Sequence, residues 1–236
     1  MYPQIFYKKN AAYTANSAKE IVPHIIKLIK PKSVLDVGCA YGVWLNEFYK
    51  NGVKDVYGID NFSPENKYLL ITQDKYLQKD LNKSFDLKKS FDLVICLEVA
   101  EHLPKKSALK LIKSLVKHSN IIIFSAAIPF QGGYKHLNEQ WPEYWVKIFQ
   151  KQNFIVIDCL RKTFWNNLNV DYWYSQNILL FVKKDQINKY PILLNELKNT
   201  GNGPLSLVHP KLYMYWGNSL EKFRYAISNR IKKIKK

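Results

Sequence analysis

Short runs of apolar residues recur along the first 184 positions of this 236-residue chain, and amphipathic segments separate them. A run of about four to eight apolar residues between turn-forming residues is typical of a strand that is buried on both faces of a parallel sheet. The pattern therefore predicts strands that alternate with helices. We expect seven strands, within residues 32–38, 53–60, 68–81, 90–98, 119–129, 154–161 and 177–184.

The segments between these runs carry apolar residues at helical spacing. The sequence SAKE has the form of a capping box, which predicts that the first helix begins at Ser17 and places Pro23 near its first turn. Further helices are expected within residues 41–52, 105–118 and 138–153. Strands that alternate with helices in this way indicate an α/β domain with a mostly parallel central sheet.

The regular alternation weakens after about residue 185, and the chain ends in the basic sequence FRYAISNRIKKIKK. We therefore expect one domain over residues 1–184, in which residues 1–16 form a lid or cover segment. Residues 185–236 are expected to form a helical, basic C-terminal extension.

Lys and Arg outnumber Asp and Glu by 36 to 19, which gives a formal net charge of +17. Such an excess favours an anionic partner, such as a nucleic acid, a nucleotide-linked substrate or an acidic membrane surface. The basic end could bind an RNA backbone, attach to an anionic membrane or contact another subunit, or it could be a solvated tail. Charge alone does not choose among these readings.

The three cysteines, Cys39, Cys96 and Cys159, are far apart and lie in apolar contexts. This arrangement predicts buried, reduced thiols rather than a metal site. The N-terminal region lacks the apolar core of a secretory signal, and no apolar run is long enough to cross a bilayer. We expect a soluble, cytoplasmic protein.

The segment VLDVGCAYGVWL, residues 34–45, joins the first predicted strand to the helix after it. Asp36 precedes two glycines, Gly38 and Gly42, which permit the close approach of a ligand and a tight turn. This arrangement resembles motif I of the class I S-adenosylmethionine-dependent methyltransferases. The resemblance covers roughly residues 15–183 and implies a Rossmann-like, doubly wound, seven-stranded sheet with helices on both faces.

By the same resemblance, residues at the carboxyl ends of the strands bind S-adenosylmethionine. Asp60 lies about 24 residues after Asp36 and corresponds to the acid that accepts hydrogen bonds from the cofactor ribose. Asp80 and Leu81 would flank the adenine, and Glu98 would lie beside the methionine portion. The implied cofactor-binding residues are Asp36, Gly38, Cys39, Ala40, Gly42, Asp60, Asp80, Leu81 and Glu98.

The segment LEVAEHL, residues 97–103, follows the fourth predicted strand with the pattern E-x-x-E-H. Its carboxylates and imidazole, with a histidine in the loop after the fifth strand, form an oxygen and nitrogen donor set suited to Mg²⁺, Mn²⁺ or Fe²⁺. The pattern is similar to the small-RNA 3′-end 2′-O-methyltransferases, which hold a metal with two glutamates and two histidines. It also occurs in ubiquinone-biosynthesis-type O-methyltransferases. The implied ligands of Mg²⁺ or Mn²⁺ are Glu98, Glu101, His102 and His136.

Two other readings of this cluster remain open. Without a metal, His102 or His136 would act as a general base, with Glu101 as a further catalytic residue. In a purely structural interpretation, Glu101 caps the following helix and His102 packs beneath it.

Aromatic side chains can stack on sugars or bases, whereas Trp145 has the pattern of a core residue. The residues expected to contact the acceptor are Tyr134, Asn138, Trp165, Tyr172 and Trp173.

The segments HLNEQWPEYW and LVHPKLY resemble stand-alone methyltransferases found among bacterial surface-polysaccharide enzymes. This resemblance implies methylation of a hydroxyl on a carbohydrate or an anionic, nucleotide-linked sugar, with assistance from a divalent metal. The first alternative is 2′-O-methylation of RNA ribose, and RNA would then be the partner. The second is a non-catalytic binding subunit that keeps the methyltransferase fold.

Overall fold

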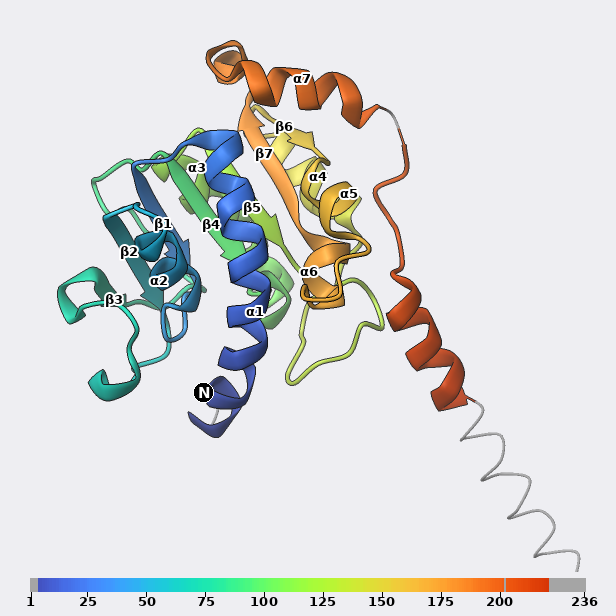
Figure 1. Ribbon diagram of the computed structural model, residues 1–236, viewed down its shortest axis with the longest axis horizontal. Coiled ribbons are helices and arrows are strands. Elements are labelled where there is room, and N and C mark those ends of the chain that lie inside the picture. Colours follow the sequence, from blue (N-terminus) through green and yellow to red (C-terminus); the bar gives the residue numbers. More distant parts are fainter. Residues whose placement is uncertain (1–3, 202, 221–236) are drawn as a thin grey trace, which may run out of the picture.

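The computed structural model describes residues 4–201 and 203–220, with side chains from residue 13 onward. Seven strands form one sheet in the order β3-β2-β1-β4-β5-β7-β6 (Figure 1). Neighbouring strands are parallel except for β7, which is antiparallel to both β5 and β6. Every strand lies within its predicted range: β1 (Ser33–Val37), β2 (Asp55–Asp60), β3 (Tyr76–Gln78), β4 (Leu93–Leu97), β5 (Ile121–Ser125), β6 (Phe154–Ile157) and β7 (Leu179–Lys183).

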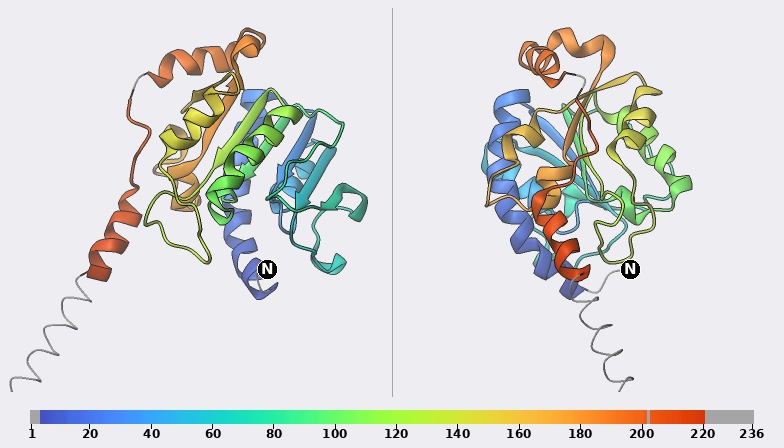
Figure 2. Two further views of the ribbon diagram at one scale, coloured as in Figure 1. Left: turned by 180° about the vertical axis from the view of Figure 1, so that it is seen from behind. Right: turned by 90° about the vertical axis from the view of Figure 1, so that its right-hand side faces the viewer.

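Helices cover both faces of this sheet, as predicted (Figures 1 and 2). Helices α1, α2, α5 and α6 pack on one face, and α3 and α4 pack on the other. The α-helices are α1 (Gln4–Ile29), α2 (Val43–Lys50), α3 (Lys105–His118), α4 (Pro142–Gln150), α5 (Leu160–Phe164), α6 (Tyr172–Asn177) and α7 (Pro191–Thr200), and a further helix spans residues 210–220. Four short 3₁₀ helices are η1 (Asn66–Tyr68), η2 (Gln73–Lys75), η3 (Ala100–His102) and η4 (Lys184–Lys189).

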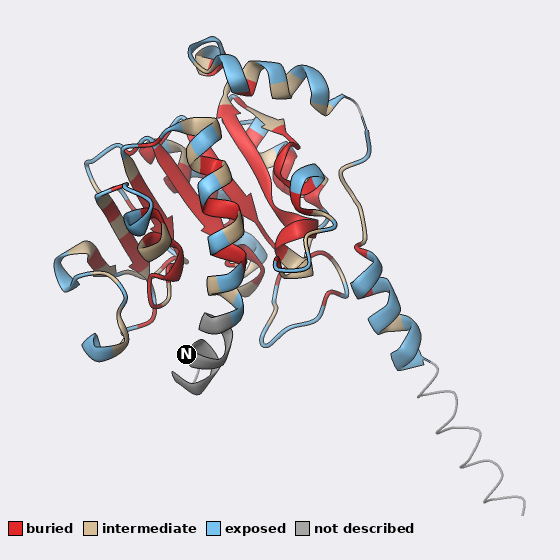
Figure 3. Ribbon diagram, in the orientation of Figure 1, coloured by how far each residue is buried: buried red, intermediate tan, exposed pale blue. Residues whose placement is uncertain are grey.

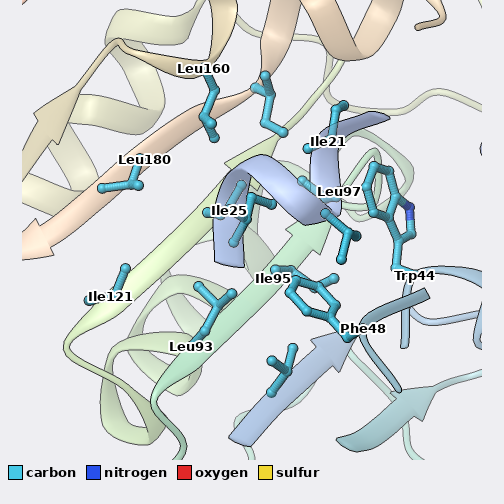
Figure 4. Close-up of a cluster of buried hydrophobic side chains, with 14 of the residues drawn as sticks. Ile21, Ile25, Trp44, Phe48, Leu93, Ile95, Leu97, Ile121, Leu160 and Leu180 are labelled. Atoms are coloured by element: carbon cyan, nitrogen blue, oxygen red, sulfur yellow. The ribbon is translucent and has the colours of Figure 1, made fainter. Parts of the chain in front are cut away.

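The strands β4 and β5 are buried along their whole length, which explains their continuous apolar sequences (Figure 3). Alternate residues point to opposite faces, so Ile95 faces the layer that contains α1 and α2. There it joins Ile25, Phe48 and other apolar side chains (Figure 4). On the other face, Trp145 is buried against Phe124, as its helical spacing predicted.

The first helix departs from the prediction. Ser17 lies inside α1 rather than at its N-terminal cap, so the capping-box reading is wrong. The buried Ser17 hydroxyl donates to the Asp171 carboxylate at 3.0 Å and accepts from the Asp171 N–H at 3.0 Å. The Ser17 hydroxyl, which the capping-box pattern assigned to the start of the helix, therefore bonds to a residue distant in the sequence, Asp171. The predicted cover segment mostly forms the start of α1, apart from residues 1–3, which lie outside the described residues.

The described part of the C-terminal extension includes α7 and the helix 210–220. Buried His209 attaches the start of this helix to the domain, because its N–H donates to the Gln176 side-chain oxygen at 2.8 Å. Arg161 donates to the carbonyl oxygen of Leu205 at 2.6 Å, just before it. The predicted basic end, residues 221–236, lies outside the described residues. Within the described range, we find no helix long and apolar enough to cross a bilayer.

Candidate functional site

A cavity of about 680 Å³ lies at the carboxyl ends of β1, β2 and β4. Loops after β1 to β5 line it, together with residues of α1 and α6. Asp36 and Asp60 lie on one part of its wall, and Glu101, His102 and His136 lie on another. The topology therefore brings the turn after β1 and the E-x-x-E-H segment to one cavity, as expected where parallel strands end together.

The turn after β1 requires glycine at position 38. Gly38 has a φ of 92°, and a Cβ there would lie 2.3 Å from Cγ2 of Val99. The Gly38 N–H donates to the carbonyl oxygen of Ile59 at 2.8 Å, which ties the turn to the end of β2. Gly38, Cys39 and Ala40 of this turn line the cavity. Gly42 has a φ of 79° and caps α2 without lining the cavity.

Asp60 connects the loops that follow β1 and β2. One carboxylate oxygen accepts the Ala40 N–H at 2.8 Å, and the other accepts the Phe62 N–H at 2.8 Å. Burial raises the pKa of Asp60, while these backbone hydrogen bonds lower it. The carboxylate lines the cavity at the end of β2, which is the position predicted for recognition of ribose hydroxyls.

Asp36 is buried at the cavity wall, and its Oδ2 has no hydrogen-bond partner among the described residues. Burial raises the pKa of Asp36 well above its ordinary value, and the nearby Asp60 raises it further. A buried acceptor without a partner is costly unless a ligand satisfies it. This end of the cavity therefore suits a ligand that carries a hydrogen-bond donor or a positive charge.

The same geometry predicts a pH-dependent stability effect for Asp36→Asn in the ligand-free protein. Because folding raises this carboxyl's pKa, wild-type stability is lost as pH rises from the unfolded-state pKa toward the folded-state pKa. Asparagine carries no charge to bury, so the variant should be more stable by about 1–3 kcal/mol at pH 8. Thermal unfolding at pH 5 and pH 8 would measure this difference, which should grow with pH.

The exposed Asp86 provides the matched control for that experiment. Its pKa is lowered by hydrogen bonds from Lys88, so Asp86→Asn should not show a gain that grows with pH. A pH-independent difference between Asp36→Asn and wild type would contradict the expected desolvation of Asp36.

Glu98 follows β4 in a left-handed conformation, with a φ of 54°. Its carboxylate accepts a hydrogen bond from the Asn177 side-chain amide at 3.1 Å and another from Gln131 at 3.1 Å. Burial raises the pKa of Glu98 to about 7, although these bonds oppose the shift. The carboxylate lines the cavity but lies outside the three-residue group described next, so its predicted role as a metal ligand stays a prediction.

The amide side chains that hold Glu98 were not predicted from the sequence. Gln131 lies in the loop after β5, and Gln176 and Asn177 end α6. Gln176 donates to the side-chain oxygen of Gln131 at 3.0 Å and to that of Asn177 at 3.0 Å. No motif or spacing marks these amides, because they come together only when α6 packs beside β5. They fix the carboxylate without supplying a charge.

The predicted group of Glu101, His102 and His136 assembles at the opposite part of the wall. One potential ligand atom from each side chain lies within 4.8 Å of the others. Glu101 and His102 belong to η3, and His136 comes from the loop after β5. This loop is held in place because the carbonyl oxygen of Glu101 accepts the Leu137 N–H at 2.7 Å and the Asn138 N–H at 2.9 Å.

Glu101 supplies the buried carboxylate of this group. Glu101 is buried, and neither carboxylate oxygen makes a hydrogen bond of normal geometry to the described residues. It therefore does not cap α3. Burial, followed by repulsion from Glu98, raises the pKa of Glu101 well above its ordinary value, although the backbone of Glu101 and Ala127 opposes the shift. A divalent ion would stabilise the ionised carboxylate that this site otherwise penalises.

The two histidines each present a ring nitrogen to the group. Burial and the neighbouring His136 lower the pKa of His102 to about 4, so the imidazole is uncharged near neutral pH. His136 contacts Glu139 through Nδ1 at 2.8 Å, which leaves Nε2 as the nitrogen for a ligand. A Cβ on Gly133 would lie 2.2 Å from this Nε2, so glycine preserves the space beside it. A carboxylate behind a ligating histidine is a common feature of metal sites.

The remaining predicted residues divide into those that line the cavity and those that do not. Leu81, Tyr134, Tyr172 and Trp173 line the cavity together with the backbone-defining residues Cys39 and Ala40. Asp80 does not line it, and its carboxylate accepts hydrogen bonds from Asn82, which does. Asn138 is buried behind the loop. Trp165 lies away from the cavity and packs against His209, with ring centroids 4.8 Å apart, so it is not brought to the predicted acceptor site.

The three cysteines are buried and free, as predicted. Burial raises the pKa of each thiol, so none is a reactive thiolate near neutral pH. Only Cys39 lines the cavity. The thiols therefore serve as apolar packing groups in the described structure.

Residues 10–170 match the family described as Methyltransferase domain, and no curated protein matches the chain. The sugar N-methyltransferase KedS8 from Streptoalloteichus sp. has a TM-score of 0.60 and 14% identity, covering 78% of this chain and 93% of that one. Magnesium protoporphyrin IX methyltransferase from Synechocystis PCC 6803 with bound SAM has a TM-score of 0.50 and 22% identity, covering 75% of this chain and 84% of that one. The methyltransferase domain of bacterial CtHen1 has a TM-score of 0.50 and 18% identity, covering 71% of this chain and 97% of that one. At these identities the structural likeness shows the fold.

Proposed function

The chain belongs to the methyltransferase domain family, and on that premise we propose that it transfers a methyl group from S-adenosylmethionine to a hydroxyl of a carbohydrate or nucleotide-linked sugar. The observation that carries this proposal is the single cavity that joins the turn after β1 to the Glu101, His102 and His136 group. A donor and an acceptor held in one cavity can react without a bimolecular encounter.

The donor end of the cavity has the chemistry that S-adenosylmethionine requires. Asp60 would accept hydrogen bonds from ribose hydroxyls, and Gly38, Cys39 and Ala40 would line the site beside the ligand. Asp36, whose Oδ2 lacks a partner, and Glu98 are acceptors that suit the donors and positive charges of the amino acid portion. When bound, S-adenosylmethionine supplies an electrophilic methyl group, and these residues fix its position.

The acceptor end suits a hydroxyl that is activated beside a metal. Glu101, His102 and His136 would hold Mg²⁺ or Mn²⁺, because a buried carboxylate without a hydrogen-bond partner and two imidazole nitrogens are ligand types that these ions accept. A bound divalent ion lowers the pKa of a coordinated hydroxyl. If no metal is bound, His102, with a pKa of about 4, is unprotonated near pH 7 and would accept the hydroxyl proton from an acceptor within hydrogen-bond reach.

Two observations favour a sugar as the acceptor. Tyr172 and Trp173 form an aromatic part of the cavity wall, and aromatic faces pack well against sugar rings. KedS8, which shares the fold, is named as a sugar N-methyltransferase. The net charge of +17 further suits a phosphate-bearing, nucleotide-linked sugar.

RNA ribose is the second candidate acceptor. The E-x-x-E-H pattern with His136 resembles the small-RNA methyltransferases, and the chain is strongly basic. RNA binding through phosphate contacts would weaken steeply with salt, with log affinity falling by about 0.7 per neutralised phosphate for each tenfold rise in salt. Weak binding that does not depend on salt would therefore count against RNA.

A labelled-methyl assay tests the proposal directly. The full chain and S-adenosylmethionine would be incubated with nucleotide sugars, glycans and small RNAs, with and without a chelator. We expect label in a sugar-bearing acceptor and loss of transfer on chelation, with recovery after Mg²⁺ or Mn²⁺ is restored. Label in RNA alone would select the second candidate. Failure to bind S-adenosylmethionine by calorimetry would instead support a non-catalytic binding subunit.

A further inference from the structure

Two segments distant in the sequence form one edge of the molecule beside the cavity. Residues 129–137 follow β5, and their inner part lines the cavity. The helix 210–220 reaches this loop, because the Trp216 indole N–H donates to the Phe130 carbonyl oxygen at 2.7 Å. Both segments lie at the end of the molecule opposite α7 (Figures 1 and 2). We refer to residues 129–137 and 210–220 together as the rim.

The rim exposes many large apolar side chains. Single exposed apolar residues are common on proteins, but several within two adjoining segments indicate an interaction surface. The exposed fractions are 80% for Phe130, 65% for Leu137, 66% for Tyr213, 57% for Met214, 65% for Tyr215 and 62% for Leu220. Buried Leu212 and His209 anchor the helix 210–220, so these exposed side chains project from an attached element.

The charge of the rim complements an anionic surface. Neither rim segment contains Asp or Glu, while Lys135 and Lys211 are exposed. The sequence that continues directly from the rim, residues 221–236, contains seven Lys or Arg residues and one Glu. Aromatic and aliphatic side chains beside basic residues are the composition that binds the headgroup region of an anionic bilayer.

We propose that the rim docks on the surface of an anionic phospholipid bilayer, so that the cavity opens toward the membrane. Tyr213, Met214 and Tyr215 would enter the boundary between headgroups and acyl chains, and Lys135 and Lys211 would face anionic headgroups. This is attachment to one leaflet, since the described helices include none able to cross it.

A second copy of the chain is the main competing occupant of the rim. Pairing two rims would bring together two surfaces that lack acidic residues and belong to chains of charge +17. Like charges repel at such a contact, whereas an anionic bilayer attracts them. The proposed docking does not depend on methyl transfer, so it can be tested without donor or acceptor.

Vesicle sedimentation with the full chain tests the proposal. The probes are phosphatidylcholine vesicles and vesicles in which about a third of the lipid is phosphatidylglycerol, in buffer of about 0.1 M salt. We expect wild-type partitioning to increase at least about tenfold on the anionic vesicles. The rim variant Tyr213→Ser/Met214→Ser/Tyr215→Ser should lower partitioning to anionic vesicles by about tenfold or more.

Tyr49→Ser/Ile192→Ser is the matched control, because these side chains are 48% and 44% exposed on α2 and α7, outside the rim. It should sediment as wild type does. Unfolding temperatures and circular dichroism would establish that each variant is folded. Equal sedimentation of the rim variant and wild type would overturn the proposal, as would no binding of wild type to anionic vesicles. Concentration-dependent dimerisation that the rim variant abolishes would assign the surface to a second copy instead.

Discussion

Alanine at Glu101 or at His136 is expected to lower turnover by about 10²–10⁴-fold while leaving the affinity for S-adenosylmethionine nearly unchanged. Both side chains belong to the group at the acceptor end of the cavity. The donor end is held by other bonds, those that Asp60 accepts from the Ala40 and Phe62 N–H groups. The split between turnover and affinity therefore distinguishes loss of acceptor activation from general damage to the fold.

Rates at saturating donor, donor affinity by calorimetry and metal content by elemental analysis would measure this prediction. Glu139→Gln should have an intermediate effect of about 10–100-fold, because Glu139 orients His136 from behind. His24→Ala, which alters a histidine of α1 outside the cavity, is the control and should leave turnover unchanged. Full activity in both alanine variants would remove these residues from the proposed mechanism. Activity that survives exhaustive chelation in metal-free protein would remove the metal.

The second large effect is expected from Asp60→Asn, which should weaken S-adenosylmethionine binding by about 10–100-fold. Both Asp60 oxygens accept backbone N–H groups, from Ala40 and from Phe62. In the asparagine variant, the side-chain NH₂ would face one of these N–H groups and could not accept its hydrogen bond. The variant would also lack the negative charge that attracts ribose hydroxyls. Turnover at saturating donor should fall much less, because the Glu101 group is untouched.

Calorimetric titration of the donor would measure the loss of affinity, and Asp86→Asn is a close control. Asp86 accepts the N–H of Lys88 at 2.8 Å, the same local bond that Asp60 makes with Phe62, but it is exposed and outside the cavity. The control should bind the donor as wild type does. If Asp60→Asn also binds the donor normally, the assignment of the ribose site to the end of β2 is wrong.

The sheet could be predicted from the sequence because its physical cause is local. Strands buried on both faces must be apolar at nearly every position, and β4 and β5 show this as LVICL and IIIFS. The start of α1 could not be predicted in the same way. Its apparent cap, Ser17, is used by Asp171, which is 154 positions away along the chain.

The candidate site was predictable to the extent that its residues follow strand ends. Asp36, Asp60 and Glu98 each stand where a parallel strand meets the cavity, and the E-x-x-E-H pattern pointed to Glu101 and His102. The amides around Glu98 carry no such signal, because an uncharged side chain in a loop has no preferred spacing. Trp165 was predicted to contact the acceptor but lies away from the cavity. An aromatic residue between strands looks exposed to substrate until His209 covers it.

The contact between Gly38 and Val99 constrains how the sequence can diverge. Gly38 lies in the turn after β1, and Val99 lies between Glu98 and Glu101. A Cβ added at Gly38 would lie 2.3 Å from Cγ2 of Val99. A larger side chain at position 99 would press on the donor turn, and any side chain at position 38 would displace the loop that carries Glu101. A substitution at either position therefore requires a compensating change at the other, because the two loops share one van der Waals boundary.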